Sequence, residues 1–240
     1  MMKTSLNVWR LIFLSILALA NLSTSRFSLW SFRGVDLNRD KSIPVYLIST
    51  SLPQIQRAFI GEVEFCVQLD EGRALVRVCG DPAGEVSWQT PPGWQVKEAF
   101  FSDLNLDGEN EIALLVWRPF QSWPVDRFMP YGGRIDSFQD KKGLSCHLIL
   151  IGVVDGGFQE LWAGSAMADP IHSLQAVDLD GDGNQELAAL EYEYDGNPQG
   201  GSLVIWHWNG FGFSLEARQA GDYSSLLVLQ TNSGRVLLTH

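Results

Sequence analysis

An acidic loop that occurs twice, each time leading directly into an apolar run, is the feature that most constrains the fold of this chain. Residues 99–115 match residues 174–190 position by position in character, and Asp178 follows Asp103 by 75 residues. Each loop is followed by an apolar run, a polar insert, a second apolar run, a glycine-containing turn and an aromatic-rich run. Such periodic self-similarity is typical of a repeat architecture. Short apolar runs broken by Gly, Asp, Asn and Pro predict strands joined by tight turns, so we expect an all-β chain of antiparallel sheets.

The spacing of the repeat predicts about three blade-like units. A fainter copy, Asp36-x-Asn38-x-Asp40, precedes the first loop by 67 residues, with Lys41 where the glycine belongs and Pro44 where the last acid belongs. This copy is either a relic that has lost its metal site or a chance likeness. Because a closed propeller needs at least four blades, the expected fold is a partial or irregular β-propeller-like assembly. We place it at residues 30–240, with the units 36–98 (degenerate), 99–170 and 174–240.

The oxygen-rich side chains of the two loops indicate calcium. Calcium takes six to eight oxygen ligands at roughly 2.4 Å, which carboxylates and carbonyls on one tight loop can supply. Positions 1, 3 and 5 turn their side chains toward one point, and a glycine at position 6 permits the sharp bend. Position 7 offers its backbone carbonyl, and position 9 offers a closing carboxylate. The ligands of the two predicted calcium sites are Asp103, Asn105, Asp107, Glu109 and Glu111 in the first loop and Asp178, Asp180, Asp182, Asn184 and Glu186 in the second.

The residues that follow each loop separate the pattern from a helical calcium site. An EF-hand places a bidentate acid at position 12 and continues into a helix, whereas position 12 here is Leu114 or Ala189 in a strand-like run. The pattern Asp-x-Asp/Asn-x-Asp-Gly-x-x-Glu running into a strand resembles the FG-GAP/VCBS family, the calcium-binding blades of integrin α-chain propellers and of many exported bacterial proteins. The resemblance covers roughly residues 96–217. It implies that calcium ties a loop between two strands of one blade and is mostly structural.

Residues 1–22 have the features of a targeting segment. Lys3 and Arg10 precede or flank an apolar stretch that ends in a small-x-small sequence at 18–20. We expect an apolar helix that acts as a secretory signal peptide; the alternatives are an uncleaved membrane anchor drawing on residues 8–22 and a buried helix. Either targeting role places the protein outside the cytoplasm, as a secreted or periplasmic protein or on the outer face of a membrane.

The chain contains three cysteines, an odd number that leaves at least one thiol unpaired. Cys66 and Cys79 flank a turn-like segment between two apolar runs. A two-residue turn at Gly72-Arg73 would place them opposite each other in a hairpin. They therefore either form a disulfide or remain as two buried thiols, and Cys146 is left over.

The charge balance excludes nucleic acid as a partner. The sequence has 17 Lys and Arg against 28 Asp and Glu, which gives a net charge of −11 and no basic face for phosphate. A nucleophile elbow, a phosphate-binding glycine loop and a dinucleotide fingerprint are absent from the sequence, and the four histidines lack ligand-like spacing. We expect a protein that is not an enzyme, although a carboxylate pair for glycoside hydrolysis would leave no local signature.

Two tryptophans indicate where a partner could bind. Trp206 and Trp208 lie two residues apart on an expected strand, so their side chains share one face. They either pack between neighbouring blades or form an exposed surface for a protein or a glycan. We therefore expect an extracytoplasmic calcium-binding module for protein or glycan binding or scaffolding. Two alternatives stay open: a membrane-anchored accessory subunit of a larger membrane protein complex, and a carbohydrate-active enzyme.

Overall fold

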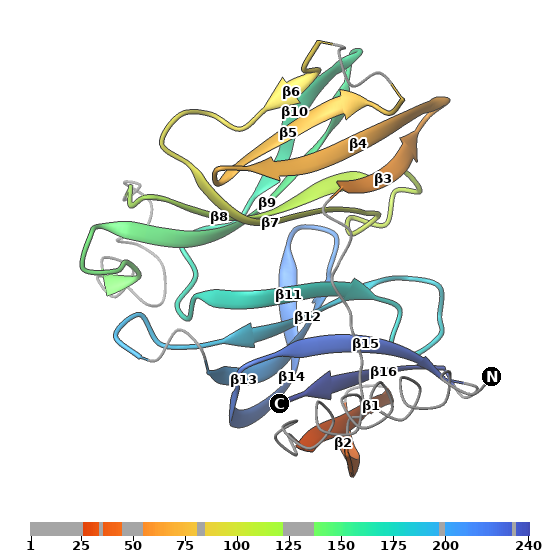
Figure 1. Cartoon of the computed structure of the whole chain (residues 1–240), viewed down its shortest axis with the longest axis vertical. Coiled ribbons are helices and arrows are strands. Elements are labelled where there is room, and N and C mark those ends of the chain that lie inside the picture. Colours follow the sequence, from red (N-terminus) through yellow and green to blue (C-terminus); the bar gives the residue numbers. More distant parts are fainter. Residues whose placement is uncertain are drawn as a thin grey trace, which may run out of the picture.

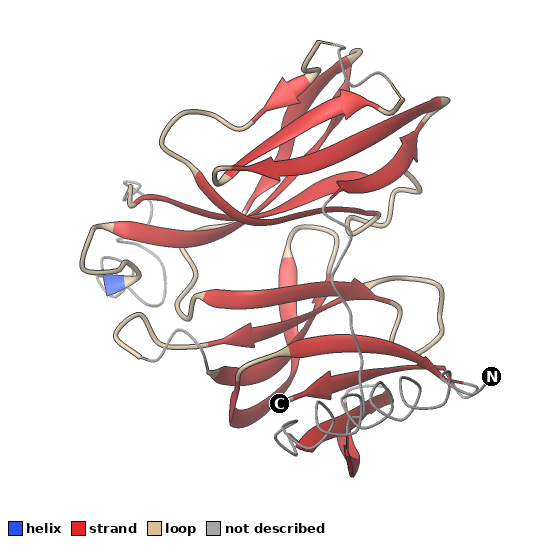
Figure 2. Cartoon of the chain, in the orientation of Figure 1, coloured by secondary structure: helices blue, strands red, loops and turns tan. Residues whose placement is uncertain are grey.

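The structure is a computed structural model that describes residues 26–33, 36–44, 55–80, 85–121, 137–196, 200–231 and 234–240. Within these residues, 16 strands form four antiparallel sheets of four strands each (Figure 1). Figure 2 shows that strands make up nearly all of the regular structure in the described part of the chain. The predicted all-β, antiparallel fold is confirmed.

Each sheet is one blade, and the blades are numbered by the position of their first strand in the chain. Blade 1 consists of β3 (Ile55–Ile60), β4 (Val63–Asp70), β5 (Arg73–Val78) and β6 (Trp88–Gln89). Blade 2 consists of β7 (Gln95–Ser102), β8 (Glu111–Pro119), β9 (Leu144–Val154) and β10 (Gly157–Ala163). Blade 3 consists of β11 (Ile171–Val177), β12 (Glu186–Glu191), β13 (Gly201–Trp208) and β14 (Phe213–Tyr223). Blade 4 consists of β15 (Leu226–Thr231), β16 (Gly234–Thr239), β1 (Arg26–Arg33) and β2 (Asp36–Pro44).

The blades follow one another in the manner of a four-bladed β-propeller. Strand β7 of blade 2 contacts β3, β4 and β5 of blade 1 and also contacts β11 of blade 3. Strand β11 in turn contacts β15 of blade 4. Blade 4 combines the two ends of the described chain, because β16 pairs with β1 in the register Trp30↔Leu237. The indole N–H of Trp30 donates a buried hydrogen bond of 2.8 Å to the hydroxyl of Thr239 across this junction.

The number of blades differs from the three units expected from the sequence. Residues 36–98 are divided, since β2 is an outer strand of blade 4 whereas residues 55–89 form blade 1. The expected unit 174–240 likewise supplies all of blade 3 and half of blade 4. The repeat was recognised by its acidic loop, which connects the first two strands of a blade. In blade 1 that connection is only the two-residue turn Gly61-Glu62, so the loop that marks a blade in the sequence is absent there.

The faint acidic copy near the N-terminus is part of a strand. Asp36, Asn38 and Asp40 lie in β2, which pairs with β1 in the register Ser31↔Asn38. A segment extended in a ladder cannot wrap around an ion, so this copy does not form a calcium loop. The predicted helix at residues 1–22 lies outside the described residues. Among the residues described, no helix has the length and apolar character needed to span a membrane.

The core lies between the blades, and the second strands of blades 2 and 3 are buried on both faces. Successive residues of β8 and β12 point to opposite faces, as strand geometry requires. Toward blade 1, β8 contributes Ile112, Leu114 and Val116. At the junction of blades 2 and 3, β8 contributes Ala113, Leu115 and Trp117, and β12 contributes Leu187 and Ala189. Toward blade 4, β12 contributes Ala188 and Leu190. Each such Leu or Ile stabilises the fold by about 1.5–3 kcal/mol, and these buried strands hold the acidic loops in place.

A disulfide between Cys66 and Cys79 joins β4 to the residue after β5, with the two Cα atoms 5.2 Å apart. The pairing left open by the sequence is therefore confirmed, but the register differs. The turn is Glu71-Gly72, both with positive φ (49° and 78°), which is the conformation of a tight hairpin turn. Cys66 consequently lies opposite Arg77, and the N–H of Cys79 bonds to the carbonyl of Glu64 at 2.8 Å. The bridge closes a loop of 13 residues and contributes about 2–3 kcal/mol.

Thiol counting provides a direct check of this assignment. Cys146 is fully buried, and its burial raises the pKa of the thiol to about 12. We expect no thiol to react rapidly with a thiol reagent in the folded protein and one thiol per chain to react after unfolding without reductant. Three thiols per unfolded chain would contradict the disulfide. Unfolding after reduction serves as the control and should give three.

Candidate metal centres

The two acidic loops occupy equivalent positions in neighbouring blades. The first acidic loop, residues 103–111, connects β7 to β8, and the second, residues 178–186, connects β11 to β12. Each closing glutamate is the first residue of a doubly buried strand and lies opposite the last residue of the preceding strand, in the registers Ser102↔Glu111 and Val177↔Glu186. The strands therefore fix both ends of each loop.

In the first acidic loop, three carboxylates converge. Oxygen atoms of Asp103, Asp107 and Glu111 lie within 4.8 Å of one another. Glu111 is 1% exposed, and its Oε2 accepts the N–H groups of Leu104 and Asn105 at 3.0 and 3.4 Å. The carboxylate of Asp103 accepts the N–H groups of Asp107 and Gly108 at 3.1 and 3.0 Å. Backbone donors thus orient the acids of this loop.

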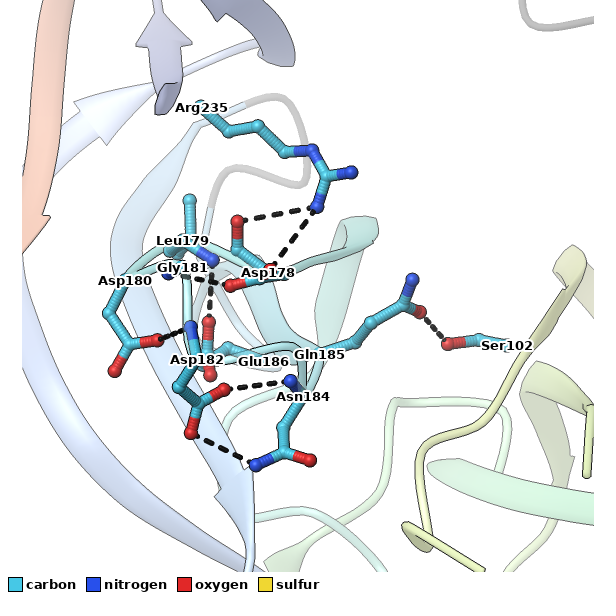
Figure 3. A network of polar contacts seen from close by, with 10 residues as sticks. All are labelled: Ser102, Asp178, Leu179, Asp180, Gly181, Asp182, Asn184, Gln185, Glu186 and Arg235. Carbon is cyan, nitrogen blue, oxygen red and sulfur yellow. Dashed lines mark hydrogen bonds and ion pairs between the residues drawn. The ribbon is translucent and has the colours of Figure 1, made fainter. Parts of the chain in front are cut away.

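The second acidic loop repeats this arrangement (Figure 3). Oxygen atoms of Asp178, Asp180 and Glu186 lie within 4.8 Å of one another. The N–H of Leu179 donates to Glu186 at 2.8 Å, as the equivalent Leu104 does to Glu111. The N–H of Gly181 donates to Asp178 at 2.7 Å. The two clusters therefore share the first aspartate, the closing glutamate and the bond that the glutamate accepts, but the middle acid is at position 5 in the first loop and at position 3 in the second.

Two left-handed residues bend each loop. Gly108 and Gly183 at position 6 have φ of 92° and 97°, as the sequence pattern predicts. Position 4 is also left-handed, with φ of 63° at Leu106 and 85° at Gly181. This second bend was not predicted from the sequence. In the sequence only Gly181 indicates this bend, because the equivalent Leu106 is of a residue type that rarely adopts positive φ.

The remaining predicted ligands lie beside the clusters. The side-chain amide of Asn105 donates to Asp107 at 2.9 Å. Asp182 lies outside the triad of the second loop and accepts the backbone and side-chain N–H groups of Asn184 at 2.7 and 2.9 Å. Glu109 turns its side chain toward blade 1, where its Oε2 accepts the N–H of Gly61 at 3.2 Å. The predicted contribution of Glu109 was its carbonyl, which leaves the side chain free for this contact.

Both closing glutamates are electrostatically strained when no cation is present. The pKa of Glu111 is raised to about 7, chiefly by burial and in smaller part by the charges of Asp107 and Asp103, against the lowering effect of the N–H bonds. The pKa of Glu186 is likewise raised to about 7, chiefly by burial and in smaller part by the charges of Asp180 and Asp182. Like charges held this close favour a cation between them. All side-chain ligands are oxygen atoms, which suits a hard divalent cation.

Contacts from neighbouring blades reach both loops. The amide of Asn110 donates to the carbonyl of Phe59 at 3.2 Å, beside the bond from Gly61 to Glu109. Arg235 of blade 4 pairs with the carboxylate of Asp178 at 3.8 Å, and Gln185 forms a hydrogen bond with Ser102 of blade 2 (Figure 3). These partners were missed from the sequence, since no local pattern marks a residue such as Arg235 that lies 57 positions away.

The fold and the two loops define an all-β, propeller-like protein with two acidic clusters that could hold metal ions. No protein-family model matches the chain, and no curated protein matches it at a significant level. The likeness of the loops to FG-GAP/VCBS repeats therefore stays a resemblance of motif and fold.

Proposed function

We propose that this protein is a non-catalytic, calcium-binding β-propeller module that works outside the cytoplasm in protein or glycan binding or in scaffolding. The observation that carries the proposal is the pair of acidic triads at equivalent positions in blades 2 and 3. A triad in each of two equivalent loops, Asp103, Asp107 and Glu111 in one and Asp178, Asp180 and Glu186 in the other, supports a repeated metal-binding element rather than two solvated turns.

Calcium is the cation that the donor set favours. Each loop offers carboxylates from one continuous segment, and backbone carbonyls can complete a shell of six to eight oxygens. Magnesium demands a near-ideal octahedron and usually retains several waters, so it is less suited to a loop of this kind. The ten proposed ligands are those predicted from the sequence: Asp103, Asn105, Asp107, Glu109 and Glu111, and Asp178, Asp180, Asp182, Asn184 and Glu186.

The proposed role of calcium is to stabilise the fold. The acids of each loop are held by backbone N–H groups, and the loops contact neighbouring blades through Gly61, Ser102 and Arg235. An ion bound here would neutralise the repulsion within a loop and fix these contacts between blades. Its position between two strands of one blade accords with the role that the family resemblance implies.

Export is supported by two features of the chain. Residues 1–22 resemble a signal peptide or anchor, and the disulfide Cys66–Cys79 would persist in an oxidising compartment. A membrane-anchored accessory subunit is the alternative that an uncleaved segment at residues 8–22 would favour. Intact-mass measurement of the native protein separates the two, because loss of about the first 20 residues indicates a free module.

Metal binding itself tests the proposal. We expect two calcium ions per chain in equilibrium dialysis with metal analysis, and one ion after Asp178→Asn or Asp103→Asn, because each change removes one charged ligand from one loop. The exposed Glu62→Gln change is the matched control and should leave two. A wild-type protein that binds no calcium at millimolar concentration would contradict the proposal.

A further inference from the structure

A second candidate site is a cavity of about 310 Å³ between blades 2 and 3. Its volume is at the lower end of the range for small-molecule pockets. The floor is apolar, with Leu148, Ile171 and Leu187 among its residues. The walls include three aromatic side chains, Trp162, Trp206 and Phe213. The rings of Trp162 and Phe213 are 5.3 Å apart at 73°, so they meet as two adjoining walls.

One corner of this cavity is charged and built around Glu191, whose side chain is 2% exposed. Oε1 of Glu191 accepts the indole N–H of Trp206 at 3.1 Å, and Oε2 pairs with the guanidinium of Arg218. Arg218 is 40% exposed and also reaches Asp169 at 3.5 Å. Two carboxylates thus share one guanidinium, and burial raises the pKa of Glu191 to about 7, so the corner carries an excess negative charge above neutral pH.

Hydrogen bonds from His147 and Tyr194 hold the loop that forms the rim of the cavity. Nδ1 of His147 bonds to the carbonyl of Gly164 at 3.0 Å. The hydroxyl of Tyr194 donates to the carbonyl of Met167 at 3.0 Å and accepts the N–H of Cys146 at the same distance. A rim held in this way does not have to be ordered when a ligand enters, so less entropy is lost on binding.

The combination of aromatic walls with an excess negative charge favours an organic cation. The negative faces of aromatic rings attract cations, by about 2 kcal/mol or more where water is excluded. A primary ammonium would need acceptors for three N–H groups, whereas each oxygen of Glu191 already accepts one bond and keeps one lone pair. A quaternary ammonium needs none and spreads its charge over apolar methyl groups, which suits a mainly apolar cavity.

We propose that the cavity between blades 2 and 3 binds a small quaternary ammonium group, with Trp162, Trp206 and Phe213 around its methyl groups and Glu191 as its counter-ion. The proposal goes beyond the proposed function, and it does not depend on the calcium sites. Loss of calcium binding and loss of ammonium binding would therefore be observed separately.

Charge recognition is tested by isothermal titration calorimetry of the calcium-treated full chain with choline and with 3,3-dimethylbutan-1-ol. The alcohol has the shape of choline, with carbon in place of the charged nitrogen. We expect one choline per chain and binding of the alcohol at least tenfold weaker. Equal binding of the two compounds, or no choline binding, would overturn the proposal. Binding of methyl β-glucoside in place of choline would also overturn it, in favour of a sugar site.

A pair of variants assigns the binding to this cavity. Glu191→Gln keeps an oxygen for the indole N–H of Trp206 but removes the charge, so choline should bind at least tenfold more weakly. Glu193→Gln makes the same change at an exposed position two residues away and should leave binding unchanged. Equal affinities of the two variants would place choline elsewhere. If Glu191→Gln fails to fold, the comparison of choline with its uncharged analogue still decides the question.

A further experiment identifies the source of the ammonium group. Free choline compounds and the headgroup of phosphatidylcholine share this chemistry. Co-sedimentation with phosphatidylcholine vesicles distinguishes them: choline binding with sedimentation assigns the site to the lipid headgroup, and choline binding without it assigns the site to a soluble compound. Both outcomes support a quaternary ammonium site.

Discussion

Removing calcium with a chelator is expected to lower the free energy of unfolding by about 5 kcal/mol. Each site that binds only the folded state contributes about 2.7 kcal/mol when free calcium exceeds the dissociation constant roughly a hundredfold, and there are two sites. For a chain of this size, the melting temperature should fall by about 10–20 °C. Thermal melting followed by circular dichroism, with calcium and with excess chelator, measures the effect. Superimposable curves would show that the loops are turns that do not depend on metal.

Neutral variants of the closing glutamates distinguish a ligand from a structural acceptor. In Glu111→Gln the amide oxygen can still accept the N–H of Leu104, but one charge of the triad is lost. In chelator this variant should be at least as stable as the wild type, because the wild-type loop then holds three carboxylates together without a cation. In calcium it should lose about half of the wild-type stabilisation. A stability loss that is equal with and without calcium would contradict a ligand role, and Glu186→Gln gives the same test for the second loop.

The candidate metal sites were predictable because their ligands lie in single short segments. The structure brings together the first and last acid of each loop, as the order of acids predicts, but the middle acid of the cluster is Asp107 in the first loop and Asp180 in the second. Contacts made across blades could not be predicted in this way. The pairing of Arg235 with Asp178 depends on how blade 4 docks against blade 3, which no local spacing encodes.

The sequence predicted the fold class but not the number of blades. The continuous burial of strands such as β8 and β12 follows from their unbroken apolar runs, which are typical of strands covered on both faces. Blade 4 was not predicted because its strands come from opposite ends of the chain. Pairing between residues so far apart produces no local sequence pattern. The cysteine hairpin was predictable for the opposite reason, since Cys66 and Cys79 are only 13 residues apart.

Replacing Glu98 should stabilise the protein at neutral and alkaline pH. It lies on β7 beside a cavity of about 760 Å³ bounded by blades 1, 2 and 3, and its Oε2 accepts the N–H of Leu174 at 3.1 Å. Burial raises the pKa of Glu98 from 4.5 to about 8, against the opposing effect of that hydrogen bond. The folded protein therefore keeps a proton that the unfolded chain loses near pH 4.5.

The difference in the pKa of Glu98 between the folded and unfolded states determines how the free energy of unfolding changes with pH. Between pH 4.5 and about 8 the folded state binds more protons at Glu98 than the unfolded state does, so stability falls as pH rises through that interval. The loss should amount to roughly 3 kcal/mol by pH 8, after allowance for partial solvation of the side chain. Glu98→Gln keeps an acceptor for Leu174 and removes the titration. In saturating calcium, its advantage over the wild type should be near zero at pH 5 and grow to roughly 3 kcal/mol at pH 8. Urea unfolding at both pH values measures it, with the exposed Glu62→Gln as control; an advantage that does not change with pH would show that Glu98 is ionised in the folded state throughout.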